Sequence, residues 1–385
     1  MSSISRRTFI RSAAAGTSVV ALAQSGVARG FPANEKVQLG WLGVGGRGSH
    51  LLRTIVKHAP DARIIAVCEL RENRGRLGQK IVEQAGQPRP KYYKDMYQMM
   101  DKEKMDGIAA ITAPSDHAGV VVPILQRDYH TFSEKPLDTT VERVDAIVKA
   151  ARKSKGFLQV GTQRRYNPGY ISGIKVIHSG QIGKVTFIQG HWHWPWRTTM
   201  RIDTHGGELV EQAVHHTDVA SWVMNNQAPH TCVSMGYQQF KRPGGPNVWT
   251  ETHSATSWMF PGGVIFSYTH LFYLPEYYTS EKMWVFCEKA GVDLRLGMMH
   301  TVDKRNVRVG ESSGTNWDKG TIEELQDFVD NIKTGGKRVP NANVETARVA
   351  TLMAIMGRMA MRNPEKNIFE PRIIRWKDLG TTTDL

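Results

Sequence analysis

The stretch Val37-Gln-Leu-Gly-Trp-Leu-Gly-Val-Gly-Gly-Arg-Gly-Ser-His50 decides the fold of the first part of this chain. An apolar run of the strand type ends in a glycine-rich turn, and a helical pattern follows at once. Gly43 permits the tight turn, Gly45 lets the backbone approach a pyrophosphate, and Gly48 lets the helix pack closely on the strand. The free N–H groups and the dipole of that helix favour an anion. The stretch therefore predicts the phosphate-binding turn of a dinucleotide fold.

An acidic residue follows this turn at the spacing that a dinucleotide site needs. The second apolar run, 64–68, ends in Glu69, where dinucleotide folds hold the adenosine ribose hydroxyls. A glycine-rich turn without a ligand is the alternative, but it does not explain why strand, glycines, helix, strand and acid follow in order. Glu69 favours NAD because it would repel a 2′-phosphate. Arg71 and Arg74 could hold that phosphate instead, so NADP stays possible.

The chain divides into two predicted domains after its first 30 residues. Alternating strand and helix patterns over 36–160 predict an α/β domain with a doubly wound parallel sheet of the Rossmann type. Residues 161–385 predict an α+β domain for substrate binding and oligomerisation, with a large open, mostly antiparallel sheet. Strands are expected at 37–43, 63–68, 107–112, 129–133, 157–161, 185–194, 230–235, 254–260, 264–270, 284–288 and 307–310. Helices are expected at 46–58, 72–85, 117–126, 139–154, 207–224, 321–333 and 343–362.

The N-terminal residues 1–30 carry a targeting pattern. Arg6-Arg7 precedes a short, weakly apolar run over 13–23 and then small residues, which is typical of a Tat signal peptide. A basic cytoplasmic N-terminus and an uncleaved anchor are the alternatives. Because the Tat translocon carries folded proteins, we expect a periplasmic or extracytoplasmic enzyme that is exported with a tightly held nicotinamide cofactor in place.

The composition fits a globular enzyme. The formal net charge is +14, and residues 1–30 hold four arginines and no acid. The remaining Lys and Arg residues are dispersed, so a solvated basic surface is favoured over a nucleic-acid site. An anionic substrate or polymer is the weaker alternative. Cys68, Cys232 and Cys287 form no CxxC motif, and we expect buried thiols, although one disulfide stays possible in an exported protein.

Three local patterns can carry chemistry. In Ser133-Glu-Lys-Pro-Leu137, Lys135 follows a strand on the ligand-binding edge of the sheet, where a lysine can relay a proton; an ordinary surface lysine is the alternative. On the helix expected at 207–224, Glu211 and His215 share a face, and His215 could also pair with Asp218; a structural histidine is the alternative. The third pattern, Gly161–Pro168, places polar side chains at the domain boundary, where a plain interdomain loop is equally possible.

Together these patterns resemble the Gfo/Idh/MocA oxidoreductase family, the group of glucose–fructose oxidoreductase and inositol dehydrogenase. The resemblance covers the chain from Val37 onward and rests on Gly-Val-Gly-Gly-Arg-Gly48, Thr112–Pro114, Asp116-His117, Glu134–Pro136, Arg164–Pro168 and Gly206–Asp218. It implies a nicotinamide cofactor, hydride transfer at a carbinol carbon and a sugar, polyol or related substrate. Members often form dimers or tetramers through the open face of the second sheet, so we expect a homo-oligomer.

The resemblance and the motifs give three sets of candidate residues. The proton chemistry is expected at Lys135, His215 and Glu211. The cofactor is expected at Gly43, Gly45, Gly46, Arg47, Gly48, Glu69, Arg71, Thr112, Pro114, His117, Glu134, Lys135 and Gln163. The substrate is expected at Arg165, Tyr166, Trp194, Arg197 and His216.

Two features separate this chain from the family pattern. The family has Asp four residues before its catalytic His, where this chain has Glu211, which reaches one methylene further. The run His191-Trp-His-Trp-Pro-Trp-Arg197 could offer a tryptophan platform for a sugar or could be an ordinary alternating strand. Its HxH spacing lacks a third ligand, so we predict no metal. Alternative functions are an NAD-dependent glycosidase that oxidises, eliminates, hydrates and reduces, and a cofactor-binding sensor without turnover.

Overall fold

In this computed structural model, the structure describes residues 35–195, 201–238, 251–272, 274–303, 305–312, 319–363, 365–366 and 368–383. The predicted signal peptide and Arg197 lie outside the described residues. In the described part, we find no helix with the length and apolar character that a membrane crossing requires.

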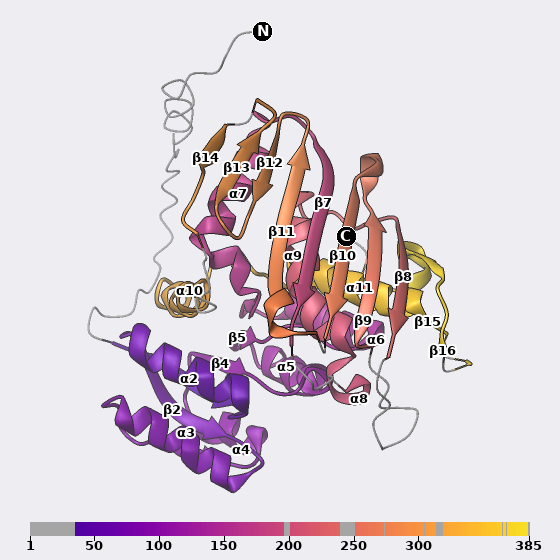
Figure 1. The fold of residues 1–385 in the computed structure, drawn as a ribbon. Coiled ribbons are helices and arrows are strands. Elements are labelled where there is room, and N and C mark those ends of the chain that lie inside the picture. The colour runs from indigo at the N-terminus through magenta and orange to yellow at the C-terminus, as the bar shows by residue number, and fades with distance from the viewer. Residues whose placement is uncertain are drawn as a thin grey trace. The chain divides into compact units, whose positions relative to one another are not determined.

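The first sheet contains, among the described residues, six parallel strands in the order β3-β2-β1-β4-β5-β6 (Figure 1). Its strands are β1 (Val37–Leu42), β2 (Ala62–Cys68), β3 (Lys91–Tyr93), β4 (Gly107–Ala110), β5 (His130–Ser133) and β6 (Leu158–Val160). Its helices are α2 (Gly46–His58), α3 (Glu72–Gln84), α4 (Met96–Lys102), α5 (His117–Leu125) and α6 (Val141–Lys153). The predicted α/β architecture is confirmed, while β3 and α4 were not predicted.

The strand order of this sheet fixes where a ligand binds. The strands that follow β1 in the chain lie on both sides of it, because β2 pairs with one edge of β1 and β4 pairs with the other. In a doubly wound sheet, this reversal opens a crevice at the carboxyl ends of the strands. The glycine-rich turn after β1 therefore lies at the predicted ligand-binding edge.

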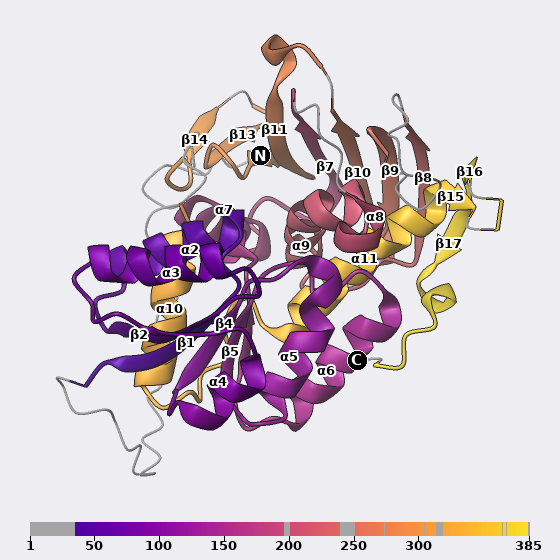
Figure 2. The same ribbon diagram turned by 90° about the horizontal axis from the view of Figure 1, so that it is seen from below.

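A helix from the C-terminal part of the chain completes the core of the first sheet. Helix α10 (Thr321–Lys333) packs on α2 (Figure 2), and its residues Leu325, Phe328, Val329 and Ile332 are buried in one cluster with Trp41. The Gln326 Nε2 atom donates a hydrogen bond of 2.8 Å to the His58 carbonyl oxygen. The helix predicted at 321–333 is therefore present, and it packs on the first sheet.

The second sheet contains nine strands within the described ranges, in the order β14-β13-β12-β11-β7-β10-β9-β8-β17. They are β7 (Val185–His193), β8 (Thr231–Tyr237), β9 (His253–Met259), β10 (Ile265–Leu271), β11 (Ser280–Cys287), β12 (Ala290–Asp293), β13 (Met298–Thr301), β14 (Asn306–Arg308) and β17 (Ile373–Arg375). The pair β7–β10 is parallel and the other pairs are antiparallel, so the predicted mostly antiparallel sheet is confirmed.

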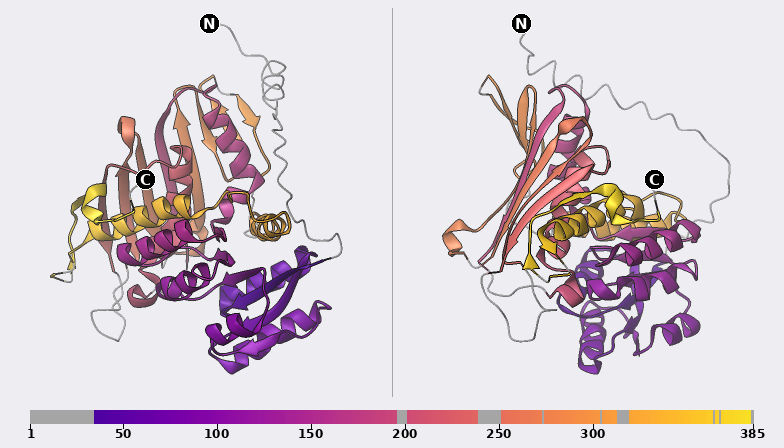
Figure 3. Two further views of the ribbon diagram at one scale, coloured as in Figure 1. Left: turned by 180° about the vertical axis from the view of Figure 1, so that it is seen from behind. Right: turned by 90° about the vertical axis from the view of Figure 1, so that its right-hand side faces the viewer.

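Helices cover the face of the second sheet that is turned toward the first (Figure 3). They are α7 (Pro168–His178), the short α8 (Ile202–His205), the π-helical turn Leu209–Ala213, α9 (Val214–Val223) and α11 (Val344–Met361). The chain also forms the two-stranded pair β15 (Arg362–Asn363) and β16 (Ile368–Phe369). The three cysteines, all within the described residues, are buried free thiols, so the disulfide alternative does not hold in this structure.

Candidate active site

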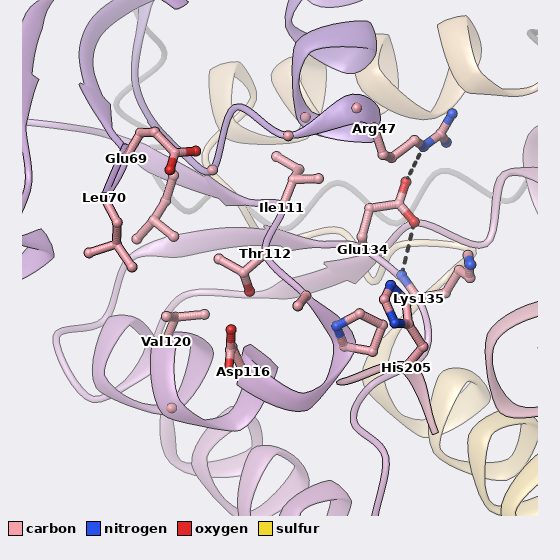
Figure 4. Close-up of a pocket in the computed structure, with 18 of the residues that line it drawn as sticks. Arg47, Glu69, Leu70, Ile111, Thr112, Asp116, Val120, Glu134, Lys135 and His205 are labelled. Atoms are coloured by element: carbon pink, nitrogen blue, oxygen red, sulfur yellow. Dashed lines mark hydrogen bonds and ion pairs between the residues drawn. The ribbon is translucent and has the colours of Figure 1, made fainter. Parts of the chain in front are cut away.

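A cleft of about 1510 Å³ runs along the carboxyl edge of the first sheet and reaches α8 and the π-helical turn of the second domain (Figure 4). Most of the predicted site residues line it. These are Gly43, Gly45, Gly46, Arg47, Gly48, Glu69, Arg71, Thr112, Pro114, Glu134, Lys135, Gln163, Trp194, Glu211 and His215. The cleft is also lined by residues that were not among the candidate site residues, including Leu70, Tyr97, Asp116, Arg143, Trp192, His205 and Gln212.

The glycine-rich turn is shaped as a cradle. A Cβ atom on Gly43, whose φ is +92°, would lie 2.1 Å from the Ile111 carbonyl oxygen, and one on Gly48 would lie 2.3 Å from the Gly43 carbonyl oxygen. Both positions therefore require glycine, whereas a Cβ on Gly46 would face open space. Helix α2, which is described in full, has no acidic residue in its first turn to compete with an anion. This cradle fits the pyrophosphate of a dinucleotide.

Glu69 is held in place at the end of β2. Its Oε2 accepts a hydrogen bond of 2.9 Å from the Val44 N–H, and its Oε1 accepts one of 3.0 Å from the Arg71 N–H. A carboxylate oxygen has two lone pairs, so each oxygen can accept a second donor. The side chain is therefore preoriented beside the turn to accept hydrogen bonds from ribose hydroxyls. Arg74 also lines the cleft, with its Nη1 3.8 Å from where a Cβ of Gly45 would lie.

Lys135 and Glu211 form an ion pair across the cleft. Lys135 follows β5, and Glu211 lies in the π-helical turn before α9. The Lys135 Nζ donates to the Glu211 backbone oxygen and to its Oε1, both at 2.8 Å. Glu211 and His215, which were expected to share a helix face, both line the cleft, and the side chain of Glu211 pairs with Lys135. A π-helical turn inside a helix often marks a functional site.

His215 is a buried imidazole beside this pair. Its ring stacks on Trp192, with 5.8 Å between the ring centres. Burial lowers the pKa of His215 well below its ordinary value, and the positive charges of Lys135 and Arg164 lower it further. The ring is therefore uncharged at neutral pH. Its Nδ1 has no hydrogen-bond partner in the described part of the chain.

Glu134 joins the phosphate-binding turn to Lys135 (Figure 4). Its Oε1 accepts a hydrogen bond of 2.7 Å from Arg47 Nε, and its Oε2 accepts one of 3.1 Å from the Lys135 backbone N–H. A Cβ on Gly161 would lie 2.9 Å from the carboxyl carbon of Glu134, so the glycine gives this carboxylate its room. The arrangement fixes the backbone from which Lys135 extends.

Arg165 and Tyr166 lie outside the lining of the cleft, and we correct the expectation that they contact a substrate. The Arg165 Nε donates to both carboxylate oxygens of Asp218, at 2.8 and 3.0 Å, and both side chains are buried. Asp218 therefore pairs with Arg165, where the sequence suggested His215. The hydroxyl of buried Tyr166 accepts a hydrogen bond from the Ala342 N–H. Both residues fasten segments of the chain together.

Two predicted histidines are also structural. His216 is fully buried, and its Nε2 lies 3.2 Å from the Lys282 carbonyl oxygen and 3.4 Å from Glu281. His117 is fully buried, and its Nδ1 lies 2.7 Å from the Pro136 carbonyl oxygen. Neither lines the cleft, so we correct the expectation that His216 contacts the substrate and that His117 contacts the cofactor. Their burial beneath the neighbouring backbone is the physical reason.

Trp192 and Trp194 form one wall of the cleft. The two residues alternate along β7 and its end, so they lie on one face of the sheet, and their rings are 6.4 Å apart. Trp194 was among the expected substrate residues, and the same alternation along the strand could have identified Trp192. The guanidinium of Arg164 lies 5.8 Å from the Trp192 ring centre and pairs with buried Glu281 at 2.5 Å.

Comparison with known proteins agrees with this geometry. Residues 37–162 match the model of an oxidoreductase family with an NAD-binding Rossmann fold, and residues 174–293 match the GFO/IDH/MocA C-terminal domain. The chain belongs to the Gfo/Idh/MocA family. Its first domain is accordingly the NAD-binding domain of that family, as predicted from the turn and Glu69.

The relatives found include polyol dehydrogenases. Inositol 2-dehydrogenase of Salmonella typhimurium is 27% identical over 192 residues, which are 49% of this chain and 55% of that protein. The scyllo-inositol 2-dehydrogenase (NAD(+)) of Bacillus subtilis is 23% identical over 190 residues, 49% of this chain and 54% of that protein. The chain thus matches about half the length of these curated relatives.

Solved structures share the fold across almost the whole chain. Levoglucosan dehydrogenase in complex with NADH and L-sorbose superposes with a TM-score of 0.73 and 16% identity, covering 90% of this chain and 100% of that one. Myo-inositol 2-dehydrogenase from Lactobacillus plantarum gives a TM-score of 0.71 at 19% identity, covering 89% and 99%. At these identities the likeness establishes the fold alone.

Proposed function

We propose that this chain is an NAD-dependent oxidoreductase that oxidises a CH–OH group of a sugar, polyol or glycoside. The observation that carries the proposal is the meeting of Lys135, Glu211 and buried His215 in the cleft that continues to the Gly43–Gly48 turn. The names of the inositol dehydrogenases among the relatives support the substrate class.

The chain's own residues fit NAD along the whole cleft. The turn would hold the pyrophosphate, Glu69 the ribose hydroxyls, and Thr112, Pro114 and Glu134 the nicotinamide half. The Thr112 Oγ1 is buried without a hydrogen-bond partner in the described structure, which leaves it ready for a ligand. When bound, NAD supplies an acceptor for the hydride that leaves the carbinol carbon.

Oxidation of a carbinol also releases a proton, and the site is built to receive it. The ring of His215 is uncharged at neutral pH, because burial and the charges of Lys135 and Arg164 lower its pKa, so one of its ring nitrogens is free of a proton and can accept that of the hydroxyl. A lysine ammonium has three donors, of which Lys135 directs two to Glu211. Its remaining donor can hold the substrate oxygen and stabilise the charge that develops there. Trp194, which is less buried than Trp192 and also lines the cleft, can offer a flat face to the C–H surface of a sugar ring.

The test is a spectroscopic assay of the purified protein with NAD and a panel of sugars, polyols and aryl glycosides. We expect one class of substrate to produce a lasting absorbance band of reduced nicotinamide. Glycoside cleavage without a lasting band would replace the proposal with the redox-neutral glycosidase. Nucleotide binding without turnover of any compound in the panel would favour the sensor.

We also propose that the protein is exported through the Tat translocon with its cofactor already bound. The support is the Arg6-Arg7 pattern, together with the need of an exported enzyme to regenerate its cofactor in place. Cell fractionation of an Arg6→Lys, Arg7→Lys double variant should leave the protein in the cytoplasm. Equal export of the variant and the original chain would contradict this proposal.

A homo-oligomer is a third part of the proposal. Large apolar side chains are exposed on strands of the second sheet, namely Val233, Met235, Tyr237, Met259 and Phe286. Burying them against a second copy would remove this surface from water. Sedimentation of the purified protein should show a dimer or larger species, and Met235→Lys should weaken it. A monomer at all concentrations would contradict the expectation.

A further inference from the structure

Arg47 lies between two carboxyl groups at the edge of the cleft. Its Nε donates to Glu134 Oε1 at 2.7 Å, and its Nη2 lies 3.9 Å from Glu324 Oε1. Glu134 follows β5 and faces the cleft, whereas Glu324 belongs to the first turns of α10, from the far end of the chain. One guanidinium on the phosphate-binding turn therefore links the Glu134–Lys135 segment to the helix that completes the first sheet.

Glu324 is an unusual residue for its position. Its side chain is fully buried, and neither carboxyl oxygen has a hydrogen-bond partner among the described residues. The titratable groups that face it are Arg47 on α2, Glu134 after β5, Tyr166 after β6 and Glu323 on its own helix. Neither the packing of the fold nor the proposed proton transfer accounts for a carboxyl group at this position.

We propose that Glu324 is a positioning residue of the cofactor cleft, which acts through Arg47 and Glu134 and, when it ionises, weakens the binding of reduced nicotinamide relative to oxidised nicotinamide. The proposal rests on the proposed function only in that the nicotinamide half of the cofactor reaches Glu134 and Lys135.

Glu324 is held in its neutral form by its surroundings. Burial raises its pKa well above the ordinary value, and the neighbouring charge of Glu134 raises it further, while Arg47 opposes both. A neutral Glu324 leaves the guanidinium of Arg47 to Glu134. Glu134 can then hold the backbone N–H of Lys135 with its second oxygen.

Loss of the proton of Glu324 changes the charge balance around Arg47. Two carboxylates then compete for one guanidinium, and the added negative charge lies in a poorly solvated place, where it acts over a longer range than in water. The oxidised nicotinamide ring carries a positive charge and the reduced ring does not. The new charge therefore favours NAD⁺ over NADH, and NADH binding in turn favours the protonated carboxyl group.

The experiment measures the dissociation constants of NAD⁺ and NADH for nucleotide-free protein from about pH 5 to about pH 9. We expect the ratio of the NADH constant to the NAD⁺ constant to rise with pH, by on the order of tenfold. Glu324→Gln keeps the shape and hydrogen-bonding atoms of the neutral acid but cannot ionise, so its ratio should stay constant. Asp330→Asn, which removes an exposed carboxylate from the same helix, should keep the original profile.

Identical ratio profiles for the original chain and Glu324→Gln, whether flat or sloped, would overturn the inference while leaving NAD binding and the proposed function intact. If the unmodified protein binds neither NAD⁺ nor NADH, the proposed function and the inference both fail. If Glu324→Gln does not fold, Glu324→Asp provides the same test, because it retains a titrating group in altered surroundings. Its profile should keep the rise at a different midpoint, and an unchanged midpoint would overturn the proposal.

Discussion

Two ion pairs connect the ends of neighbouring strands in the first sheet to the same helical run of the second domain. Lys135 pairs with Glu211 and Arg165 pairs with Asp218, each with a shortest N–O distance of 2.8 Å. The side chains of the first pair are 11% and 15% exposed and line the cleft, while those of the second are 3% and 1% exposed and lie outside its lining. The two pairs are therefore alike in charge and distance and differ in their access to the cleft, which is why we assign the reaction to the first pair and a structural role to the second.

The surroundings of the pairs explain the difference. Arg165 binds Asp218 through both carboxylate oxygens, donates to Asn226 at 2.9 Å and lies over the ring of Trp222. Burial raises the pKa of Asp218, and Arg165 opposes that change. The pair is satisfied within the protein. Lys135, by contrast, has a third donor that the Glu211 contacts do not use.

The largest expected effect follows from removing the reactive cation. Lys135→Met keeps the length of the side chain but removes the donors that face the substrate oxygen, so kcat should fall by about 10²- to 10⁴-fold. The free energy of unfolding should fall less than it does when the more deeply buried Arg165–Asp218 pair is broken, because Lys135 and Glu211 border the cleft. Steady-state rates and urea unfolding measure the two quantities, with exposed Lys175→Met as the control. An unchanged kcat would remove the assigned role from Lys135.

Breaking the buried Arg165–Asp218 pair should affect stability more than turnover. Asp218→Asn leaves the charge of Arg165 buried without a counter-charge, so the free energy of unfolding should fall by about 3–5 kcal/mol. The folded fraction should keep most of its turnover. Asp203→Asn, which breaks the exposed pair with Arg201, is the matched control and should leave the free energy of unfolding nearly unchanged. A stable Asp218→Asn variant with a collapsed kcat would reverse the contrast between the two pairs.

The sequence identified the members of these pairs but not their pairing. Helical periodicity placed Glu211, His215 and Asp218 on one face and suggested contacts among them. The actual partners are 76 and 53 residues away in the chain, on segments that only the tertiary fold brings close. The phosphate-binding turn was predictable for the opposite reason, because its strand, glycines and helix are neighbours in sequence and each glycine has a local steric cause.

The difference between local and long-range signals also explains why α7 and the packing of α10 were not predicted. Helix α7 has a local signal, since the Asn167 side chain accepts a hydrogen bond from the Gly169 N–H and Pro168 occupies the first turn. Its two glycines weakened the helical pattern. The position of α10 had no local signal, because its apolar face could pack on either sheet and only the fold directs it to α2.

The histidines near the second sheet extend the comparison to pH. His270 is fully buried, and burial lowers its pKa to about 3, whereas an unfolded histidine titrates at about 6.5. Below about pH 6.5 the imidazole of His270 binds a proton in the unfolded chain but not in the folded chain. The free energy of unfolding therefore decreases as the pH is lowered. One such histidine lowers the free energy of unfolding by about 2 kcal/mol when the pH is lowered from about 6.5 to about 5. In urea unfolding, His270→Phe should reduce the loss of unfolding free energy over this pH range by that amount. An unchanged slope of the unfolding free energy against pH would show that His270 does not titrate on unfolding.

The smallest effect is expected from shortening Glu211, which contacts Lys135. Glu211→Asp withdraws the carboxylate that contacts Lys135 Nζ but keeps the backbone oxygen of residue 211, which lies at the same 2.8 Å. Because one of two positioning contacts remains, kcat/KM should fall only about fivefold, equivalent to about 1 kcal/mol. Glu211→Gln, which keeps the length and loses the charge, separates reach from charge in the same assay. A loss as large as that of Lys135→Met would instead make the Glu211 carboxylate a participant in proton transfer, because positioning through the backbone would then contribute too little to explain the site.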